Sequence, residues 1–214
     1  MSDTPSTIRL YDSLKREPVD ALLHVGLTED QIRAAQADWE PVRKQGIETL
    51  HRRGVALDAL PKHWGWDWTR KISRLGSKVL GFYGIECAGQ MQGMIEVAKE
   101  GYLAKLPAQK GKPLIYVRYI ETAPWNLKLL EPKPRYGGVG ARLIRVATEL
   151  SLDEGYKGRV GLHSLPGQNK GEPEWFYGNT CKMQPIEAER DGEGLLYFEL
   201  TPEKATDFLK GGTS

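Results

Sequence analysis

The sequence predicts an α+β or α/β (mixed α/β) fold built on one mixed sheet. Two observations support this prediction. Strand-like segments occur between residues 78 and 200, and an amphipathic helix that opens on glycines lies among them. Before residue 76, in contrast, apolar residues recur at helical spacing, which predicts an N-terminal helical extension.

The N-terminal extension is expected to comprise residues 1–75 and to pack on a main domain of residues 76–214. Thr28 precedes two acidic residues and is a candidate N-cap for a helix with apolar residues at helical spacing. Pro41 is expected to kink or divide this helix. A second helix is expected to end near Gly54.

The main domain is expected to begin with an antiparallel hairpin. Residues 79–86 and 91–97 are largely apolar and flank the turn signal Ala88-Gly89. Residues 114–121 have the strongest strand pattern of the chain. The elements expected after it are a loop over 122–134, a helix that ends near Asp153, a strand at 158–164, a short helix at 172–178 and a strand at 195–200.

Composition and charge argue against several protein classes. The chain has 214 residues, of which 40% are hydrophobic, and no apolar run approaches the roughly 20 residues that span a bilayer. Its beginning lacks the basic and apolar regions of a secretory signal, so we expect a cytoplasmic protein. The net charge of +2 is too small to favour nucleic-acid binding. Cys87 and Cys181 cannot build a disulfide framework and lack metal-ligand spacing, so no metal is expected.

The glycine-rich run at residues 135–140 is the most informative segment. It has the sequence Arg-Tyr-Gly-Gly-Val-Gly and leads into an amphipathic helix. Glycines allow close approach of the backbone, and the N–H groups of a first helical turn attract anions, so the run predicts a pyrophosphate site. It lacks the Gly-Lys-Ser/Thr of a Walker A loop, and Leu143 stands where a dinucleotide fingerprint needs a small residue. The alternative is an ordinary glycine turn before a packed helix.

Four segments occur in a specific order along the chain. They are Phe82-Tyr83-Gly84-Ile85 with Gly89 and Gly93-Met94-Ile95, the strand that ends at Glu121 with Pro124 behind it, Arg135-x-x-Gly138-x-Gly140, and Trp175-Phe176-Tyr177. In this order they resemble the core of the GNAT superfamily of N-acetyltransferases over roughly residues 77–200, and the resemblance implies a central, mixed and mostly antiparallel sheet flanked by helices. Two features depart from the family pattern: residues 125–134 lengthen the loop before the glycines, and Gly178-Asn179 replaces a common Glu-Lys pair.

The resemblance implies acetyl-coenzyme A as the acyl donor, in the role of a cosubstrate, and an amine as the acceptor. The edge of the strand 114–121 would pair with the pantetheine amides. Glu121 would be the general base, directly or through water, and Tyr177 would donate a proton to the coenzyme sulfur. From the residues alone, a surface carboxylate and a core tyrosine remain open alternatives. The residues implied to bind the coenzyme are Arg135, Tyr136, Gly137, Gly138, Val139, Gly140 and Ala141.

The expected function is therefore an N-acetyltransferase that acylates a primary amine by direct transfer in a ternary complex. A small-molecule amine is the first choice of acceptor. Alternatives that stay open are a protein amine or an aminoacyl-tRNA as acceptor, a non-catalytic acyl-coenzyme A binding module, and an interaction protein in which the glycines form only a turn. A homodimer is compatible with related folds, although nothing in the sequence specifies an interface.

Two further groups of residues remain secondary candidates. Trp64, Trp66 and Trp68 alternate, so an extended segment would place them on one face, with Asp67 available to attract an ammonium group. The alternative is that these tryptophans staple the helical extension to the sheet. His163 and Ser164 stand at the end of an expected strand, where a histidine is more often structural than catalytic.

Overall fold

The computed structural model describes residues 5–55, 62–127, 133–167 and 172–211. Hydrogen bonding links the described strands in the order β6-β1-β2-β3-β4-β5-β7-β9-β8. The pairing is mostly antiparallel, with a parallel pair of β5 (Ile115–Thr122) and β7 (Val160–Ser164). The fold is thus α+β with a mixed sheet, as the sequence predicts. No helix in the described ranges is long and apolar enough to cross a membrane.

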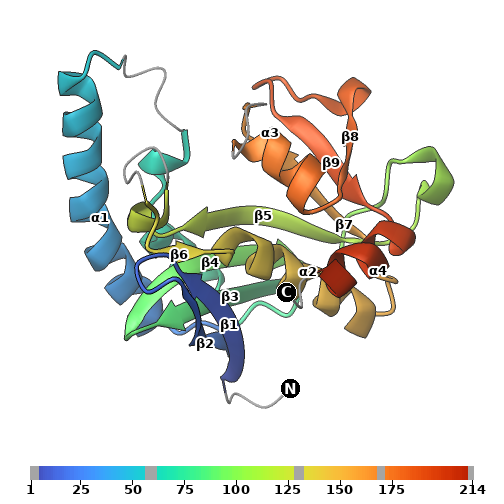
Figure 1. The fold of residues 1–214 in the computed structure, drawn as a ribbon. Helices are drawn as coiled ribbons and strands as arrows, with labels where there is room; N and C mark the ends of the chain where they lie inside the picture. The colour runs from blue at the N-terminus through green and yellow to red at the C-terminus, as the bar shows by residue number, and fades with distance from the viewer. Residues whose placement is uncertain (1–4, 56–61, 128–132, 168–171, 212–214) are drawn as a thin grey trace. The chain divides into compact units, whose positions relative to one another are not determined.

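The chain forms two compact units, and the first combines residues 1–77, 82–94 and 120–140. Its strands include β1 (Ser6–Asp12) and β2 (Glu17–Val25), which form a hairpin with alternating burial (Figure 1). The end of β2 pairs with β3 (Leu80–Cys87), and the short β6 (Tyr136–Gly137) pairs with β1. In the β1–β2 turn, the Asp12 carboxylate accepts hydrogen bonds from the N–H groups of Leu14 and Lys15.

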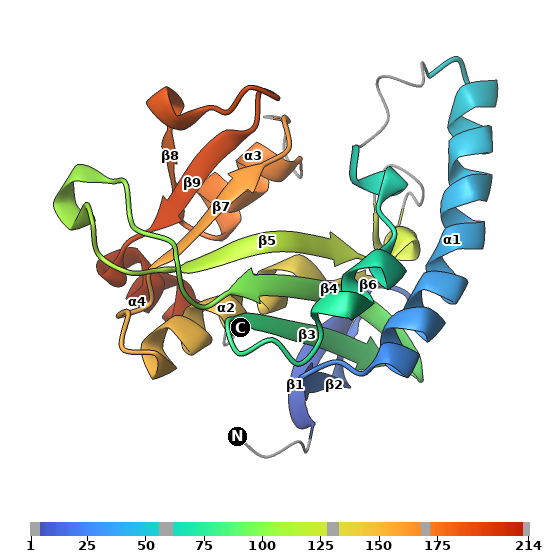
Figure 2. The same ribbon diagram turned by 180° about the vertical axis from the view of Figure 1, so that it is seen from behind.

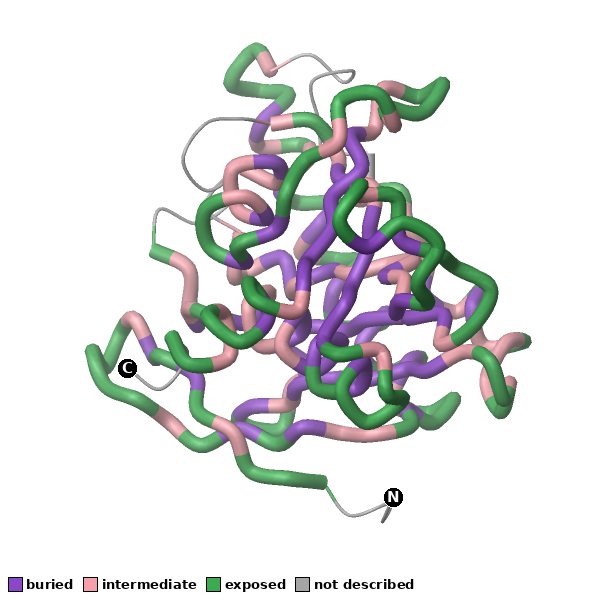
Figure 3. Tube along the Cα trace, turned by 90° about the vertical axis from the view of Figure 1, so that its right-hand side faces the viewer, coloured by how far each residue is buried: buried purple, intermediate pink, exposed green. Residues whose placement is uncertain are grey.

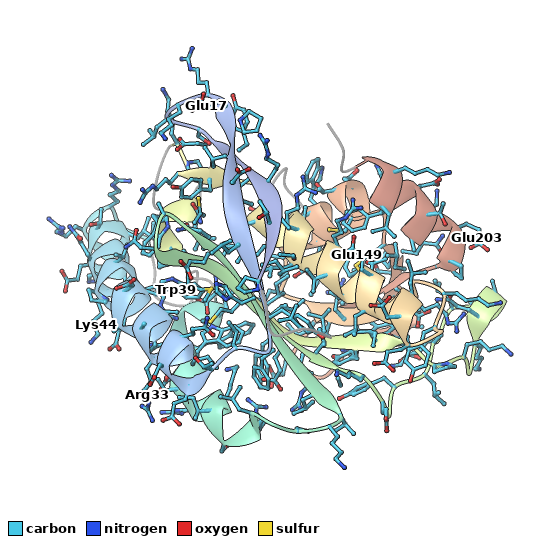
Figure 4. All side chains as sticks on the ribbon, turned by 90° about the horizontal axis from the view of Figure 1, so that it is seen from below. Glu17, Arg33, Trp39, Lys44, Glu149 and Glu203 are labelled. Atoms are coloured by element: carbon cyan, nitrogen blue, oxygen red, sulfur yellow. The ribbon has the colours of Figure 1, made fainter. Side chains whose placement is uncertain are left out.

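Helix α1 (Glu29–Arg52) belongs to the same unit and begins at a capping box. The Thr28 hydroxyl accepts from the Gln31 N–H, and the Gln31 side chain accepts from the Thr28 N–H. Trp39 is fully buried and points from α1 toward the strands, where its indole N–H donates to the Met91 carbonyl at 3.0 Å (Figure 4). Arg33 and Lys44 point away from this face.

The second unit combines residues 78–81, 95–119 and 141–214. Within it β9 (Leu196–Leu200) pairs antiparallel with both β7 and β8 (Gln184–Ile186), and Figure 2 shows these strands side by side. Helix α2 (Val139–Asp153) connects β5 to its parallel partner β7. The unit also contains α3 (Pro173–Trp175) and a π-helical turn (Phe176–Thr180) before β8, and α4 (Pro202–Gly211) after β9.

The core lies along the strands, which Figure 3 shows as mostly buried, whereas turns and outer helix faces are exposed. Strand β4 (Gln90–Ala98) has eight buried positions in succession, which is typical of a strand covered on both faces. The turn between β3 and β4 has positive φ at Ala88 (53°) and Gly89 (74°). This pair of angles is that of a type I′ turn, so the predicted hairpin signal at Ala88-Gly89 is confirmed.

Two predictions for the first 75 residues are wrong. Residues 6–12 and 17–25 form strands, whereas a purely helical segment was expected. Pro41 lies inside α1 without ending it, so one helix of 24 residues replaces the two expected. An extended segment would have placed the three tryptophans on one face, but Lys62–Gly65 and Trp68–Arg74 form 3₁₀ helices, so this condition is not met. The N-cap at Thr28, the end of the helix near Gly54, and the helical character of residues 29–52, 62–65 and 68–74 agree with the expectation.

Candidate functional site

The glycine run forms the turn from β6 into α2 in the structure. Gly138 has a φ of +85°, a left-handed conformation that disfavours any residue with a side chain. A Cβ atom placed there would meet nothing within 4 Å, so space is open beside the first turn of α2. The neighbouring Tyr136 and Val139 are buried and hold the turn to the core.

Arg135 is engaged by its neighbours within the first unit. Its guanidinium lies over the Tyr136 ring, 5.1 Å from the centroid, and donates to the Gln90 side-chain oxygen at 3.2 Å. The Asn126 side chain in turn accepts a hydrogen bond from the Tyr136 N–H. The structure therefore orients Arg135 beside the turn rather than leaving it extended into solvent.

The long loop before the glycines is tied to β4 at its start. Trp125 donates its indole N–H to the Gln92 side-chain oxygen at 2.7 Å, and Asn126 donates to the same oxygen at 3.0 Å. Residues 128–132 of the predicted insertion lie outside the described residues.

Glu121 lies at the end of β5, and its side chain is only 1% exposed. One carboxylate oxygen accepts from Arg43 on α1 at 3.2 Å, and the other accepts from the Trp68 indole N–H at 2.7 Å. The predicted alternative of a surface carboxylate is therefore wrong for this residue. Glu121 is a buried carboxyl group with a donor on each oxygen.

Arg43 connects three segments of the first unit. Besides Glu121, its guanidinium donates to the Trp66 carbonyl at 2.8 Å and to the Gln36 side chain at 3.2 Å. The Gln36 oxygen also accepts from the Trp68 N–H at 3.1 Å. We call this buried network the Glu121 network. It consists of the Trp66 carbonyl and the side chains of Gln36, Arg43, Trp68 and Glu121.

Burial controls the protonation of the Glu121 network. Desolvation raises the pKa of Glu121 from 4.5 to about 7, although the positive charge of Arg43 and the Trp68 hydrogen bond lower it. Desolvation and the charge of Arg43 lower the pKa of His63 to about 4. Glu121 can therefore gain and lose a proton near neutral pH, which is a property of general bases.

Trp68 is the tryptophan that packs inside this network. Trp68 is fully buried, and Lys71 lies 5.1 Å from its ring centroid and 5.7 Å from that of Trp66. Asp67 caps the following 3₁₀ helix by accepting from the Thr69 N–H. The staple interpretation fits Trp68, whereas the side chain of Trp64 lies outside the described residues.

Tyr177 lies in the π-helical turn of the second unit. Its ring packs against Phe176 and Phe198 at centroid distances of 5.2 and 6.0 Å, and 9% of the residue is exposed. Burial raises its pKa well above the usual value. Among the residues that the structure describes, its hydroxyl has no hydrogen-bond partner. The phenol therefore stays protonated at neutral pH, and its donor is not used by another described residue.

Strands β5 and β7 pair over a short stretch of the second unit. They pair in register at Ile115↔Val160, Tyr116↔Gly161 and Val117↔Leu162, and no further register pair joins these two described strands.

Sequence reasoning missed Gln36 and Arg43, although a signal was present. Both residues lie on the buried stripe of α1 with Ile32, Ala35 and Trp39. Polar residues seven positions apart on an apolar stripe indicate a shared buried partner. That partner, Glu121, is distant in sequence, so the stripe alone could not identify it.

Comparison with known proteins identifies the fold. No family model matches the sequence, and no curated protein matches it. The structure is similar to the GNAT domain of PAT from S. lividans, with a TM-score of 0.55 at 13% identity over 92% of this chain and 96% of that one. It is also similar to an uncharacterized protein from Bacillus halodurans, with a TM-score of 0.54 at 12% identity over 99% of both chains. The chain therefore has the fold of a GNAT domain.

Proposed function

We propose that this protein is an N-acetyltransferase that transfers an acetyl group from acetyl-coenzyme A to a primary amine. The observation that carries the proposal is the glycine turn at the start of α2 in a chain with a GNAT fold. The left-handed Gly138 and the open space beside it suit a diphosphate, which the N–H groups of the first helical turn would bind. The proposed binding segment is residues 135–141.

The proposed chemistry needs a base for the ammonium group and a donor for the departing thiolate. Glu121 has a pKa of about 7 and would accept the amine proton. Because both its oxygens already accept hydrogen bonds, we propose that a water carries the proton to it. The Tyr177 hydroxyl would donate to the sulfur as the thioester bond breaks and the amide bond forms.

Binding is tested by calorimetric titration with acetyl-coenzyme A. Gly138→Asp places a carboxylate beside the proposed phosphates, and we expect it to abolish micromolar binding. Gly155→Asp is the matched control, because Gly155 follows the other end of α2 with a φ of +76° and equally open space. Both variants carry the same backbone strain, so loss of binding in both, or in neither, would contradict the proposed cradle.

A second function is favoured by the burial of Glu121. A carboxylate that is 1% exposed and paired with Arg43 is also what a structural ion pair requires, so the protein could bind acyl-coenzyme A without catalysis. Turnover with a panel of small amines separates the two functions. In an enzyme, Glu121→Gln reduces turnover while the affinity for acetyl-coenzyme A is retained; in a binding module, the wild type shows no turnover.

A further inference from the structure

The second unit has a surface pocket of about 240 Å³ that the proposed chemistry does not use. Residues of α3, the π-helical turn, β8 and β9 line it, and Figure 2 shows β8 and β9 side by side (Figure 2). The lining residues that carry the argument are Glu174, Trp175, Gly178, Glu187, Leu196 and Phe198. All of them belong to the second unit, so the pocket lies within one compact body.

Part of the pocket wall is apolar. Leu196 and Phe198 on β9 are each only 2% exposed, whereas Trp175 is half-buried and keeps part of its indole accessible. Apolar and aromatic walls are typical of pockets that bind small molecules.

Gly178 keeps the pocket open. It is the first residue of the Gly178-Asn179 pair that departs from the family pattern. Its backbone is π-helical rather than left-handed, and a Cβ atom there would meet the Phe198 ring at 3.8 Å, an ordinary contact. The position therefore tolerates a side chain but carries none, which leaves this volume to a ligand.

Glu174 supplies a buried carboxylate to the pocket. Its side chain is 6% exposed, and its Oε1 atom accepts a hydrogen bond from Arg190 at 3.2 Å. Its Oε2 atom accepts none from the residues that the structure describes. A buried carboxylate oxygen without a donor is costly, so a ligand that donates to Oε2 gains this free energy.

Arg190 balances only part of the negative charge around the pocket. Its guanidinium also donates to the Glu187 carboxylate at 3.2 Å and to the Gly194 carbonyl at 2.7 Å. Two carboxylates against one guanidinium leave a net negative charge, and none of the described lining residues is basic. The pocket therefore favours a cation.

We propose that this pocket binds a small organic cation that carries an ammonium group on a short apolar chain. The ammonium would donate to Oε2 of Glu174, and the chain would cover Leu196 and Phe198. The Trp175 ring would add cation–π attraction. The volume is below the roughly 300–1,000 Å³ of pockets for drug-sized ligands, which suits a short amine. The inference does not rest on the proposed function, because Glu121, Tyr177 and residues 135–141 do not line the pocket.

NMR titration at constant ionic strength tests the ligand class, with n-pentylammonium chloride and 1-pentanol as probes of equal chain length. The indole N–H signal of Trp175 reports binding and is assigned from its loss in Trp175→Phe. We expect this signal to shift with a dissociation constant of about 1 mM for the ammonium. The alcohol lacks the charge, so we expect it to bind about tenfold more weakly.

A pocket-filling variant tests the location. Gly178→Leu should abolish binding of pentylammonium, because the new side chain occupies the space beside Phe198. Gly192→Leu is the matched control, since Gly192 also has open space and no left-handed φ but does not line the pocket. This control should bind pentylammonium like the wild type.

Two charge variants test the role of the carboxylates. Glu174→Gln should weaken pentylammonium binding by at least about tenfold. Glu187→Gln leaves the buried pair of Glu174 and Arg190 in place, and it should weaken this binding about two- to fivefold without changing that of pentanol. Glu193→Gln is the control, because Glu193 is an exposed residue of the same loop that does not line the pocket.

Three results would overturn the inference. They are no shift of the Trp175 signal with pentylammonium, equal affinities for pentylammonium and pentanol, and unchanged pentylammonium binding in Gly178→Leu. None of these results bears on the binding of acetyl-coenzyme A, so the inference and the proposed function can fail independently.

Discussion

Replacing Glu121 by glutamine should change how the free energy of unfolding depends on pH. In the folded protein the carboxyl group keeps its proton until the pH reaches about 7, whereas in the unfolded chain it releases the proton above 4.5. Between these values the folded state binds more protons than the unfolded state, so stability falls as the pH rises. Glutamine cannot ionise, so the variant does not lose this stability as the pH rises.

The magnitude follows from the difference between the two pKa values. At about 1.4 kcal/mol per pKa unit, the shift from 4.5 to about 7 corresponds to about 3 kcal/mol. We therefore expect Glu121→Gln to gain about 3 kcal/mol relative to wild type between pH 4.5 and pH 8. The imperfect hydrogen bonds of the glutamine amide with Arg43 and Trp68 add a penalty that does not depend on pH.

Urea unfolding at constant ionic strength measures this difference at each pH. Far-UV circular dichroism is the suitable signal, because Trp68 fluorescence would respond directly to the titration of its hydrogen-bonded partner. Glu149→Gln is the control, since Glu149 is a solvent-exposed residue on α2 and its replacement should change stability by less than about 0.5 kcal/mol (Figure 4). A constant difference between Glu121→Gln and wild type from pH 4.5 to 8 would refute the reasoning.

Four further predictions concern single positions. Arg43→Met leaves the Glu121 carboxylate without its cation, so it should lower the free energy of unfolding by about 3–5 kcal/mol at pH 8. The loss should be smaller at pH 5.5, where the carboxyl group is protonated. Equal losses at both pH values in urea unfolding would contradict this. Trp68→Phe removes the indole donor and should lower the free energy of unfolding in the same assay. The loss should exceed that of the comparison variant Trp66→Phe by about 1.5–3 kcal/mol. Ala88→Gly relieves a φ of 53° in the β3–β4 turn and should stabilise by about 0.5–1 kcal/mol in thermal unfolding; a lower midpoint would count against the turn geometry. Gly158→Ala would place a Cβ 2.6 Å from that of Ala205 at a φ of +79° and should cost about 3 kcal/mol, and adding Ala205→Gly should recover part of this loss if the contact is real.

Local patterns predicted the second half of the fold well. The β3–β4 hairpin, the strand over 115–122, the helix that ends at Asp153 and the late strand all have dense apolar runs bounded by turn residues. Strand β1 was missed because its only buried positions are Leu10 and Asp12, and a buried aspartate does not contribute to an apolar strand pattern. Pro41 was misread because its missing hydrogen bond is outweighed by the packing of the residues around it, such as Trp39.

The candidate site could be predicted only where function depends on local conformation. The turn from β6 into α2 requires a left-handed φ at Gly138. Because neighbouring residues in the chain form this turn, the sequence indicates the position of the glycine directly. The Glu121 network instead joins residues 36, 43, 66, 68 and 121, and the partners of a buried charge are set by packing rather than by spacing. The roles of Glu121, Tyr177 and residues 135–141 in catalysis and binding stay predictions.

The division of the chain into two compact units has a consequence for engineering. Each unit is assembled from separate stretches of sequence, and strands β3, β4 and β5 contribute residues to both. A polypeptide that ended at Ser77 would lack β3, the strand that pairs with Leu22–Val25. No contiguous fragment of the gene therefore encodes a whole unit, and two half-chains could regain the fold only by complementing each other in a mixture.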